Sequence, residues 1–383
     1  MRLQTLVLIA ILAAMSLPGS AADAPVQVAA YYFPNWHRKP GDPADAFGEW
    51  PNLQRAIPRF PGHQQPKKPL WGYLDESDLA VMARKIDAAA DYGVSSFIFC
   101  WYYHAAGPML DEALRQGYLK APNQKRVPFA LMWANHDAGK DRPGAILREV
   151  FDKMADSIVT DYFSQPSYWR VDGRLYFSIY EIETFIKGMG GVEKTREALD
   201  DLRRKTAAAG LGGVHINIVD WQLRDPKTAP DICRKLNADS STSYVWIHHV
   251  PLREFPAVDY LTVRDAYFKL CDEHFSKLGI PHFPNVMVGW DPTPRLRPDQ
   301  KHTGKAYPDT PVVTGNTPAR FRDALAEAKT RAMRLPPTQR IVTIYAWNEW
   351  SEGGYLEPDE GHKFAYLEAI REVFGAKARS STP

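Results

Sequence analysis

Eight stretches with the composition of buried strands, each followed by a stretch with helical periodicity, recur along this chain of 383 residues. The predicted strands are rich in β-branched and aromatic residues and lie at 26–32, 94–100, 127–133, 174–180, 214–219, 240–246, 283–288 and 341–347. Alternating strands and helices of this kind form parallel sheets. Eight such units predict an α/β fold, a single (β/α)8 barrel of the triosephosphate isomerase (TIM) type.

The helical stretches between these strands have apolar residues at helical spacing. They are predicted at 78–92, 108–119, 145–162, 192–209, 230–236, 263–278, 318–334 and 363–374, with Ser77 capping the first of them. A long loop, residues 38–76, follows the first strand and has little periodicity. Loops of this length are uncommon in compact domains. We expect either a binding loop, with groups such as Glu49 and His63 for a polar ligand, or a packed insertion.

Polar and aromatic residues follow nearly every predicted strand where its apolar part ends. In a barrel these ends gather on one face, where such enzymes keep their active sites. The chain is rich in aromatic residues (12%, with 11 Trp), and flat rings pack on the apolar faces of sugars, although Trp also fills cores. The candidates for sugar contact are Tyr32, Trp36, His37, Trp71, Trp101, Tyr103, Trp133, Asn135, His136, Glu181, Trp221, Trp246, Trp290, Trp347, Asn348, Trp350 and Tyr355.

The last predicted strand ends in two glutamates, Glu349 and Glu352, set among Trp347, Trp350 and Tyr355. Enzymes that cleave glycosidic bonds need two carboxyl groups, one of which protonates the leaving oxygen. Packing beside aromatic rings would raise the pKa of such an acid from its usual ~4.3 by desolvation. The alternative is that either glutamate caps a helix or lies in solvent.

The spacing of these glutamates sets a structural condition. Residues three apart on a regular strand point to opposite faces, so the pair converges only if the chain has turned by Ser351. Gly353 and Gly354 favour such a turn. Carboxyl groups ~5–5.5 Å apart would favour retention of anomeric configuration, and ~6.5–9.5 Å inversion.

Composition and the N-terminus limit the partners. The net charge is +2 with acids and bases interspersed, so we expect no nucleic acid or anionic lipid partner. Arg2, a short apolar run at 6–17 and small residues at 18–24 predict a secretory signal peptide at 1–24, with the mature domain at 25–383. We expect a secreted or periplasmic bacterial protein, monomeric and free of the membrane after signal removal.

The three cysteines give little information on the fold. Cys233 and Cys271 fall in neighbouring predicted helices, so a disulfide is possible in an oxidising compartment, and Cys100 is left over. His248 and His249 are adjacent and would point to opposite faces of a strand. Since no Cys and His set has the spacing of metal ligands, we expect no metal and no cofactor.

Five motifs carry a family resemblance. They are AYYFPNWH at 30–37, PGHQQP at 61–66, PLWGY at 69–73, FALMWANH at 129–136 and WNEWSE at 347–352. With these motifs the chain resembles the WbsX-like, or glycoside hydrolase family 99-like, proteins, and more distantly the endo-α-mannosidases and endo-α-mannanases. The resemblance implies a (β/α)8 catalytic domain that acts on glycans.

The resemblance also implies distinct roles for the two carboxylates. Glu349 would deprotonate the 2-hydroxyl of the sugar, and Glu352 would act as general acid and then base. The reaction would retain configuration through a 1,2-anhydro sugar, which requires O2 trans to the leaving group, as in an α-mannoside. Two positions depart from the pattern: Cys100 stands where many relatives carry Asp, and Ser351 where the related mannosidases often have His.

We therefore expect an exported glycoside hydrolase that acts on a polysaccharide or oligosaccharide, with an α-mannoside-like substrate as one candidate. Two alternatives remain open. A glycosyltransferase-like protein of polysaccharide assembly would need an activated sugar donor, although the chain has no Gly-rich phosphate loop. A non-catalytic glycan-binding barrel would keep the aromatic residues and lack turnover.

Overall fold

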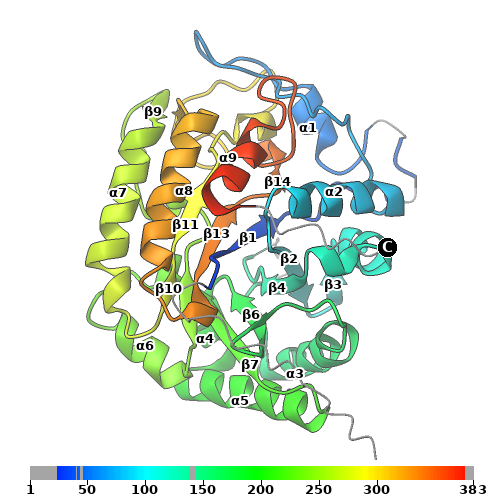
Figure 1. Ribbon diagram of the computed structural model, residues 1–383, viewed down its shortest axis with the longest axis vertical. Coiled ribbons are helices and arrows are strands. Elements are labelled where there is room, and N and C mark those ends of the chain that lie inside the picture. Colours follow the sequence, from blue (N-terminus) through cyan, green and yellow to red (C-terminus); the bar gives the residue numbers. More distant parts are fainter. Residues whose placement is uncertain (1–23, 40, 44–45, 138–142, 376–383) are drawn as a thin grey trace, which may run out of the picture.

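The computed structural model describes residues 24–39, 41–43, 46–137 and 143–375, so nearly all of the predicted signal peptide lies outside the described residues. Parallel strands form a nearly closed barrel at the centre of the molecule (Figure 1). The barrel strands are β1 (Gln27–Tyr32), β2 (Ser96–His104), β4 (Phe129–Trp133), β6 (Arg174–Ile179), β7 (Val214–Val219), β8 (Ser240–Thr242), β10 (His282–Phe283), β11 (Asn285–Met287) and β13 (Ile341–Tyr345).

The strand order confirms the predicted (β/α)8 barrel. Along the sheet the order is β10-β8-β7-β6-β4-β2-β1-β13-β11. β10 pairs with β8 and β11 pairs with β13, and Pro284 stands between them in the chain. Proline has no N–H to donate and interrupts a strand. β10 and β11 are thus two halves of one barrel strand, which pairs on both sides and brings the sheet back to its beginning.

Helices surround the barrel on its outer side (Figure 1). They are α1 (Trp50–Gln54), α2 (Leu79–Asp91), α3 (Arg148–Ser157), α4 (Ile182–Met189), α5 (Val192–Ala208), α6 (Ala229–Leu236), α7 (Tyr260–Glu273), α8 (Pro318–Ala332) and α9 (Ala365–Phe374). Most of them bury an apolar face against the barrel, as α8 does with Phe321, Leu325 and Ala328, whereas α1 packs on the one-turn helices Thr293–Arg295 and Trp350–Glu352. In Figure 1 the loop after β1, with α1, lies at the upper end of the barrel near the end of β13.

The helix predicted at 108–119 is wrong. β2 continues through His104 and folds back on β3 (Gly107–Met109) as an antiparallel hairpin. Gly107, at φ 103°, makes the turn in a conformation that favours glycine. A π-helical turn, Ala113–Gly117, and a 3-10 turn, Tyr118–Lys120, follow in place of an α-helix. The hairpin carries Tyr102 and Met109 above the barrel mouth.

Other boundaries differ in smaller ways. Asp78, not Ser77, caps α2, since its carboxylate accepts the backbone N–H groups of Ala80 and Val81. The strand predicted at 240–246 ends at Thr242, and Trp246 begins a one-turn helix. Short strands not predicted from sequence are β5 (Arg170–Val171), β9 (Ala257–Asp259), β12 (Val312–Thr314), β14 (Asn348–Glu349) and β15 (Gly354–Tyr355).

All three cysteines lie in the described part of the chain, and each is buried and unpaired. The possible disulfide between Cys233 and Cys271 is therefore not formed; Cys271 instead lies 3.8 Å from Nε2 of His282. Within the described ranges, no helix is both long enough and apolar enough to traverse a lipid bilayer.

Candidate active site

The two predicted catalytic glutamates lie on a tight turn at the carboxyl end of β13. β14 and β15 pair as antiparallel strands, and a one-turn helix, Trp350–Glu352, joins them through Gly353. Gly353 has φ 70°, and a Cβ there would approach the Cβ of Asp291 to 3.0 Å, so the position favours glycine. The chain thus bends at Ser351, which meets the condition that the spacing of Glu349 and Glu352 imposes.

One guanidinium holds both carboxylates. Nη2 of Arg295 lies 3.1 Å from Oε1 of Glu349, and its Nη1 contacts Oε1 of Glu352. Because the terminal nitrogens of one guanidinium are close neighbours, the two carboxylates lie side by side around a single cation. Arg295 sits on a one-turn helix, Thr293–Arg295, in the segment after β11.

A third carboxylate completes this cluster. Glu49, from the long loop after β1, lies 3.0 Å from Nε of Arg295 and accepts a hydrogen bond from the Ser351 hydroxyl. The loop therefore contributes directly to the site, which favours its interpretation as a binding loop over that of a packed insertion. Glu352 also accepts hydrogen bonds from the hydroxyls of Tyr345 and Tyr307, the latter at 2.7 Å.

The electrostatics of the cluster favour a proton acceptor at Glu349. Burial, together with the nearby charge of Glu352, raises the pKa of Glu349 well above its usual value, while Arg295 acts in the opposite direction. Burial alone would lower the pKa of Arg295, but its three carboxylate neighbours raise it well above the usual value. Arg295 is consequently a permanent cation beside a carboxylate of enhanced basicity.

A buried ion network lies beside the turn that carries Glu349 and Glu352. Nζ of Lys85, on α2, lies 2.5 Å from Glu76 and 2.6 Å from Glu357. Glu76 accepts a hydrogen bond of 2.8 Å from the amide of Asn348, and Glu357 accepts one of 2.7 Å from the indole of Trp350. Burial raises the pKa of Glu76 to about 7 although Lys85 opposes the shift. The network thus holds Asn348 and Trp350, the two residues that flank Glu349.

The glutamates line a cavity of about 630 Å³ at the mouth of the barrel. This volume is in the range of small-molecule sites. Besides Glu349 and Glu352, the residues proposed from sequence that line it are His136, Glu181, Trp221 and Trp290. Burial raises the pKa of Glu181 and lowers that of His136. The cavity therefore combines acidic, neutral polar and aromatic groups, as a sugar site requires.

The structure does not bring the other sugar-contact candidates to this cavity. They are Tyr32, Trp36, His37, Trp71, Trp101, Tyr103, Trp133, Asn135, Trp246, Trp347, Asn348, Trp350 and Tyr355. Most of them lie beyond the barrel strands, and for Trp101 and Trp133 the reason is strand parity, because side chains alternate between the barrel interior and its outer face. On β2 and β4 it is Cys100, Tyr102 and Met132 that line the cavity, while Trp101 and Trp133 fall between them.

These residues instead hold the walls together. The Trp133 ring packs on Phe151 and Phe185 of the surrounding helices. The Trp246 indole donates a hydrogen bond of 3.0 Å to the carbonyl of Asn285. The amide of Asn135 bridges the backbone N–H and carbonyl of Glu181 at 2.7 and 2.8 Å. Trp36 donates to the carbonyl of Asn348 at 2.9 Å. Their role is to position the strand ends.

Several cavity residues were not among the candidates. They are Tyr102, Tyr180, Tyr244, His248, Arg295 and Tyr307. Strict alternation along β2 would have selected Tyr102 over Trp101 and Tyr103. Burial lowers the pKa of His248 to about 3, so its imidazole is neutral. Arg295 and Tyr307 lie in a loop without periodicity, where no local pattern distinguishes them.

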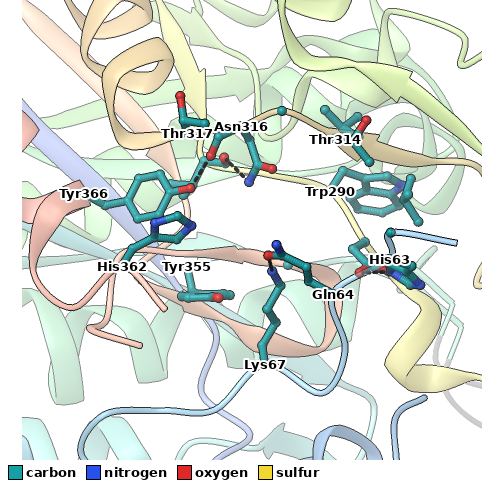
Figure 2. A pocket seen from close by; sticks show the side chains of 17 residues that line it. His63, Gln64, Lys67, Trp290, Thr314, Asn316, Thr317, Tyr355, His362 and Tyr366 are labelled. Atoms are coloured by element: carbon teal, nitrogen blue, oxygen red, sulfur yellow. Dashed lines mark hydrogen bonds and ion pairs between the residues drawn. The ribbon is translucent and has the colours of Figure 1, made fainter. Parts of the chain in front are cut away.

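A second, smaller cavity of about 260 Å³ lies next to the first, and Trp290 lines both. Figure 2 shows Tyr355, His362 and Tyr366 on one side of it and Trp290 and His63 on the other. Nε2 of His63 lies 2.8 Å from Oδ2 of Asp291. The backbone N–H of Asp291 donates a hydrogen bond of 2.6 Å to the carbonyl of Glu352. In the described part of the chain, no three His, Cys, Asp or Glu side chains are arranged to hold a metal ion.

Solved structures with a similar fold include glycoside hydrolases. The GH99 endo-α-mannosidase from Bacteroides thetaiotaomicron matches with a TM-score of 0.55 and 14% identity, covering 91% of this chain and 96% of that one. A protein described as glycoside hydrolase-like matches with a TM-score of 0.58 and 12% identity, covering 93% and 96%. At these identities the likeness establishes the fold, a glycoside hydrolase family 99-like barrel.

A family model described as Glycosyltransferase WbsX matches residues 28–370. The chain belongs to the WbsX family. The protein WxcX of Xanthomonas campestris pv. campestris strain B100 is 27% identical over 91% of this chain and 50% of its own length. WxcX of strain ATCC 33913 is 28% identical with the same coverage. This chain thus spans about half the length of these two relatives.

Proposed function

We propose that this protein is an exported glycoside hydrolase that cleaves a glycosidic bond in a polysaccharide or oligosaccharide, with retention of configuration. The observation that carries the proposal is the pairing of Glu349 and Glu352 around Arg295 at the mouth of a cavity of about 630 Å³. Two carboxyl groups side by side at a site of this size are what hydrolysis of a glycoside requires.

The environments of the two carboxyl groups support different roles. Glu349 removes the proton from the 2-hydroxyl, since burial and Glu352 make its carboxylate a strong base. O2 then attacks C1, the bond from C1 to the leaving oxygen breaks, and Glu352 protonates that oxygen. Water, deprotonated by Glu352, opens the 1,2-anhydro ring at C1, and O2 recovers its proton from Glu349.

Arg295 and the tyrosines position the acid and base. Arg295 lowers the pKa of Glu349 and thereby keeps part of the population ionised. The hydroxyls of Tyr345 and Tyr307 hold Glu352 from two sides. A substrate with O2 trans to its leaving group, such as an α-mannoside, fits this chemistry. The fold of the GH99 endo-α-mannosidase supports the same class of substrate.

A glycosyltransferase is the second candidate, because the matching family model is described as Glycosyltransferase WbsX. A retaining transferase would use the same two carboxylates, with an acceptor hydroxyl in place of water. The two candidates differ in the co-substrate that the protein consumes.

The experiment is digestion of a glycan panel by the mature protein, with reducing ends measured and the anomeric configuration of the first product followed by NMR. Release of reducing ends with retained configuration supports the proposal. An inverted product removes the 1,2-anhydro route, and turnover only with a nucleotide-linked or lipid-linked sugar favours the transferase. Binding without product in every glycan would identify a glycan-binding barrel.

A further inference from the structure

The cavity has two unlike parts. Its charged part carries Glu49, Arg295, Glu349 and Glu352. Its part over β2, β3 and β4 is largely apolar, and the hydroxyl of Tyr102 is the polar group there. There Cys100 of β2 lies directly beside Met132 of β4 in the strand register, and Tyr102 lies beside Met109 of β3. All four line the cavity, together with Leu110 and with Ala134 just after β4.

This apolar wall has few groups that could bond a hydroxyl. Cys100 is 2% exposed, and its Sγ lies 3.6 Å from the hydroxyl of Tyr244, which it already contacts. Burial raises the pKa of this thiol, so the wall carries no charge there. Met132 and Ala134 have no conventional hydrogen-bonding atoms in their side chains. Val245 and Ile247, after β8, extend the apolar lining on another side of the cavity.

Polar side chains line the rest of the cavity, among them those of Asn35, Tyr180 and Thr310. Glu349 and Glu352 take O2 and the anomeric oxygen in the proposed function, on which this step rests. His136, Glu181 and His248 offer partners for two further ring hydroxyls. In a pyranose, C5 lies across the ring from C2, so a ring held at O2 by Glu349 directs C5 and its C6 substituent away from the charged cluster.

We infer that the sugar bound at the carboxylate pair is a 6-deoxyhexose, whose C6 methyl group packs on the wall formed by Cys100, Met109, Met132 and Ala134. A methyl group loses contact with water there and gains apolar contacts. The hydroxyl of an ordinary hexose at C6 would lose its water there, and Cys100, Met109, Met132 and Ala134 offer only weak hydrogen-bonding partners or none in return, which is costly.

Matched sugar pairs that differ only at C6 test the inference. They are methyl α-D-rhamnoside and α-D-mannoside, methyl β-D-quinovoside and β-D-glucoside, and methyl α-L-rhamnoside and α-L-mannoside. Binding is measured by calorimetry to the Glu352→Gln variant, so that turnover plays no part. We expect the 6-deoxy member of at least one pair to bind about 10–100-fold more tightly than its hexose, the range for a hydroxyl excluded by an apolar pocket.

Variants locate the preference on the wall. Cys100→Ser and Met132→Gln, each placed in the Glu352→Gln background, add a polar group at the wall. Each should reduce the ratio of the affinity for the 6-deoxy glycoside to the affinity for its hexose at least about 5-fold. Cys233→Ser makes the same cysteine substitution at a buried position on α6, away from the cavity. It should leave the ratio unchanged. Circular dichroism of each variant checks that the fold is retained.

Three outcomes would overturn the inference. They are equal or tighter binding of the hexoses, no binding of any of the six glycosides, and a preference that Cys100→Ser and Met132→Gln leave intact. None of them depends on turnover. Release of reducing ends together with a preference for hexoses would support the proposed function and contradict the 6-deoxy assignment. Selective binding of 6-deoxy glycosides without any product would support the 6-deoxy assignment and contradict the proposed function.

Discussion

Nη2 of Arg295 lies 3.1 Å from Oε1 of Glu349, and the side chain of Glu349 is almost completely buried. The same guanidinium contacts Glu352. The two carboxyl groups therefore share one cation, and the charge of Glu352 adds to burial in raising the pKa of Glu349. This coupling is the basis of the predictions on activity.

Replacing either carboxylate should remove activity and leave the fold intact. We expect Glu349→Gln and Glu352→Gln each to reduce kcat at least ~100-fold, because each loses a proton-transfer step. Turnover of a substrate found in the glycan panel measures the effect, with circular dichroism as the check on folding. Glu183→Gln, on the exposed face of α4, is the matched control. Near-normal turnover in either active-site variant excludes that residue from the mechanism.

The pH dependence of activity should reflect the raised pKa of Glu349. A base must be ionised to act, so kcat/KM should rise with pH through a limb that lies well above the ~4.3 of an ordinary glutamate. Arg295 lowers this pKa, so Arg295→Met should shift the limb to higher pH as well as reduce the rate. Arg297→Met, an exposed change in the same loop, should leave the limb in place. A limb that stays or moves to lower pH in Arg295→Met contradicts the assignment.

Lys85 should contribute strongly to stability. Lys85→Met leaves Glu76 and Glu357 buried without their cation, and loss of one partner from a buried ion network typically costs about 3–5 kcal/mol. Urea unfolding measures the loss, and Lys187→Met on the exposed side of α4 should change little. Adding Glu76→Gln and Glu357→Gln to Lys85→Met should recover part of the stability. A triple variant as unstable as the single one would count against burial of charge as the cause.

Replacing a tryptophan inside the cavity and one outside it should affect KM differently. Trp221 lines the cavity and is partly exposed, whereas Trp71 is partly exposed outside it and packs against Arg84 and Phe364. Trp221→Ala should raise KM about 3–10-fold with a smaller change in kcat, since an aromatic platform binds ground state and transition state alike. Trp71→Ala should leave both constants near normal. A larger rise of KM in Trp71→Ala would restore Trp71 to the substrate-contact set.

The sequence predicts the barrel well because its signals are local. Runs such as Val214–Val219 and Ile341–Tyr345 are rich in β-branched apolar residues, as expected for buried strands, and the structure places fully buried strands there. The sequence did not predict the hairpin of β2 and β3, because this hairpin depends on pairing between the two strands. Tyr102 and Tyr103 are compatible with a strand or a loop, and contact with Pro108 and Met109 decides between them.

The candidate site was predicted in its centre and missed at its edges. Glu349 and Glu352 follow directly from the strand end and the Gly-Gly turn. The aromatic character of Trp101 and Trp133 predicts sugar contact, but strand parity places both side chains on the outer face. Arg295 could not be found, because its partners Glu49 and Glu349 are 246 and 54 residues away in sequence.

The ion pair between Arg295 and Glu49 joins the loop after β1 to the segment after β11. In a chimera that takes only the loop after β1 from a relative, Arg295 would lose its Glu49 partner. The new loop would either supply no carboxylate there or bring a different charge close to Arg295. Specificity in this barrel is therefore transferable only as a matched set of loops. Among relatives, substitutions at positions 49 and 295 should accompany one another, and an alignment in which the two vary independently would show that the pair is dispensable.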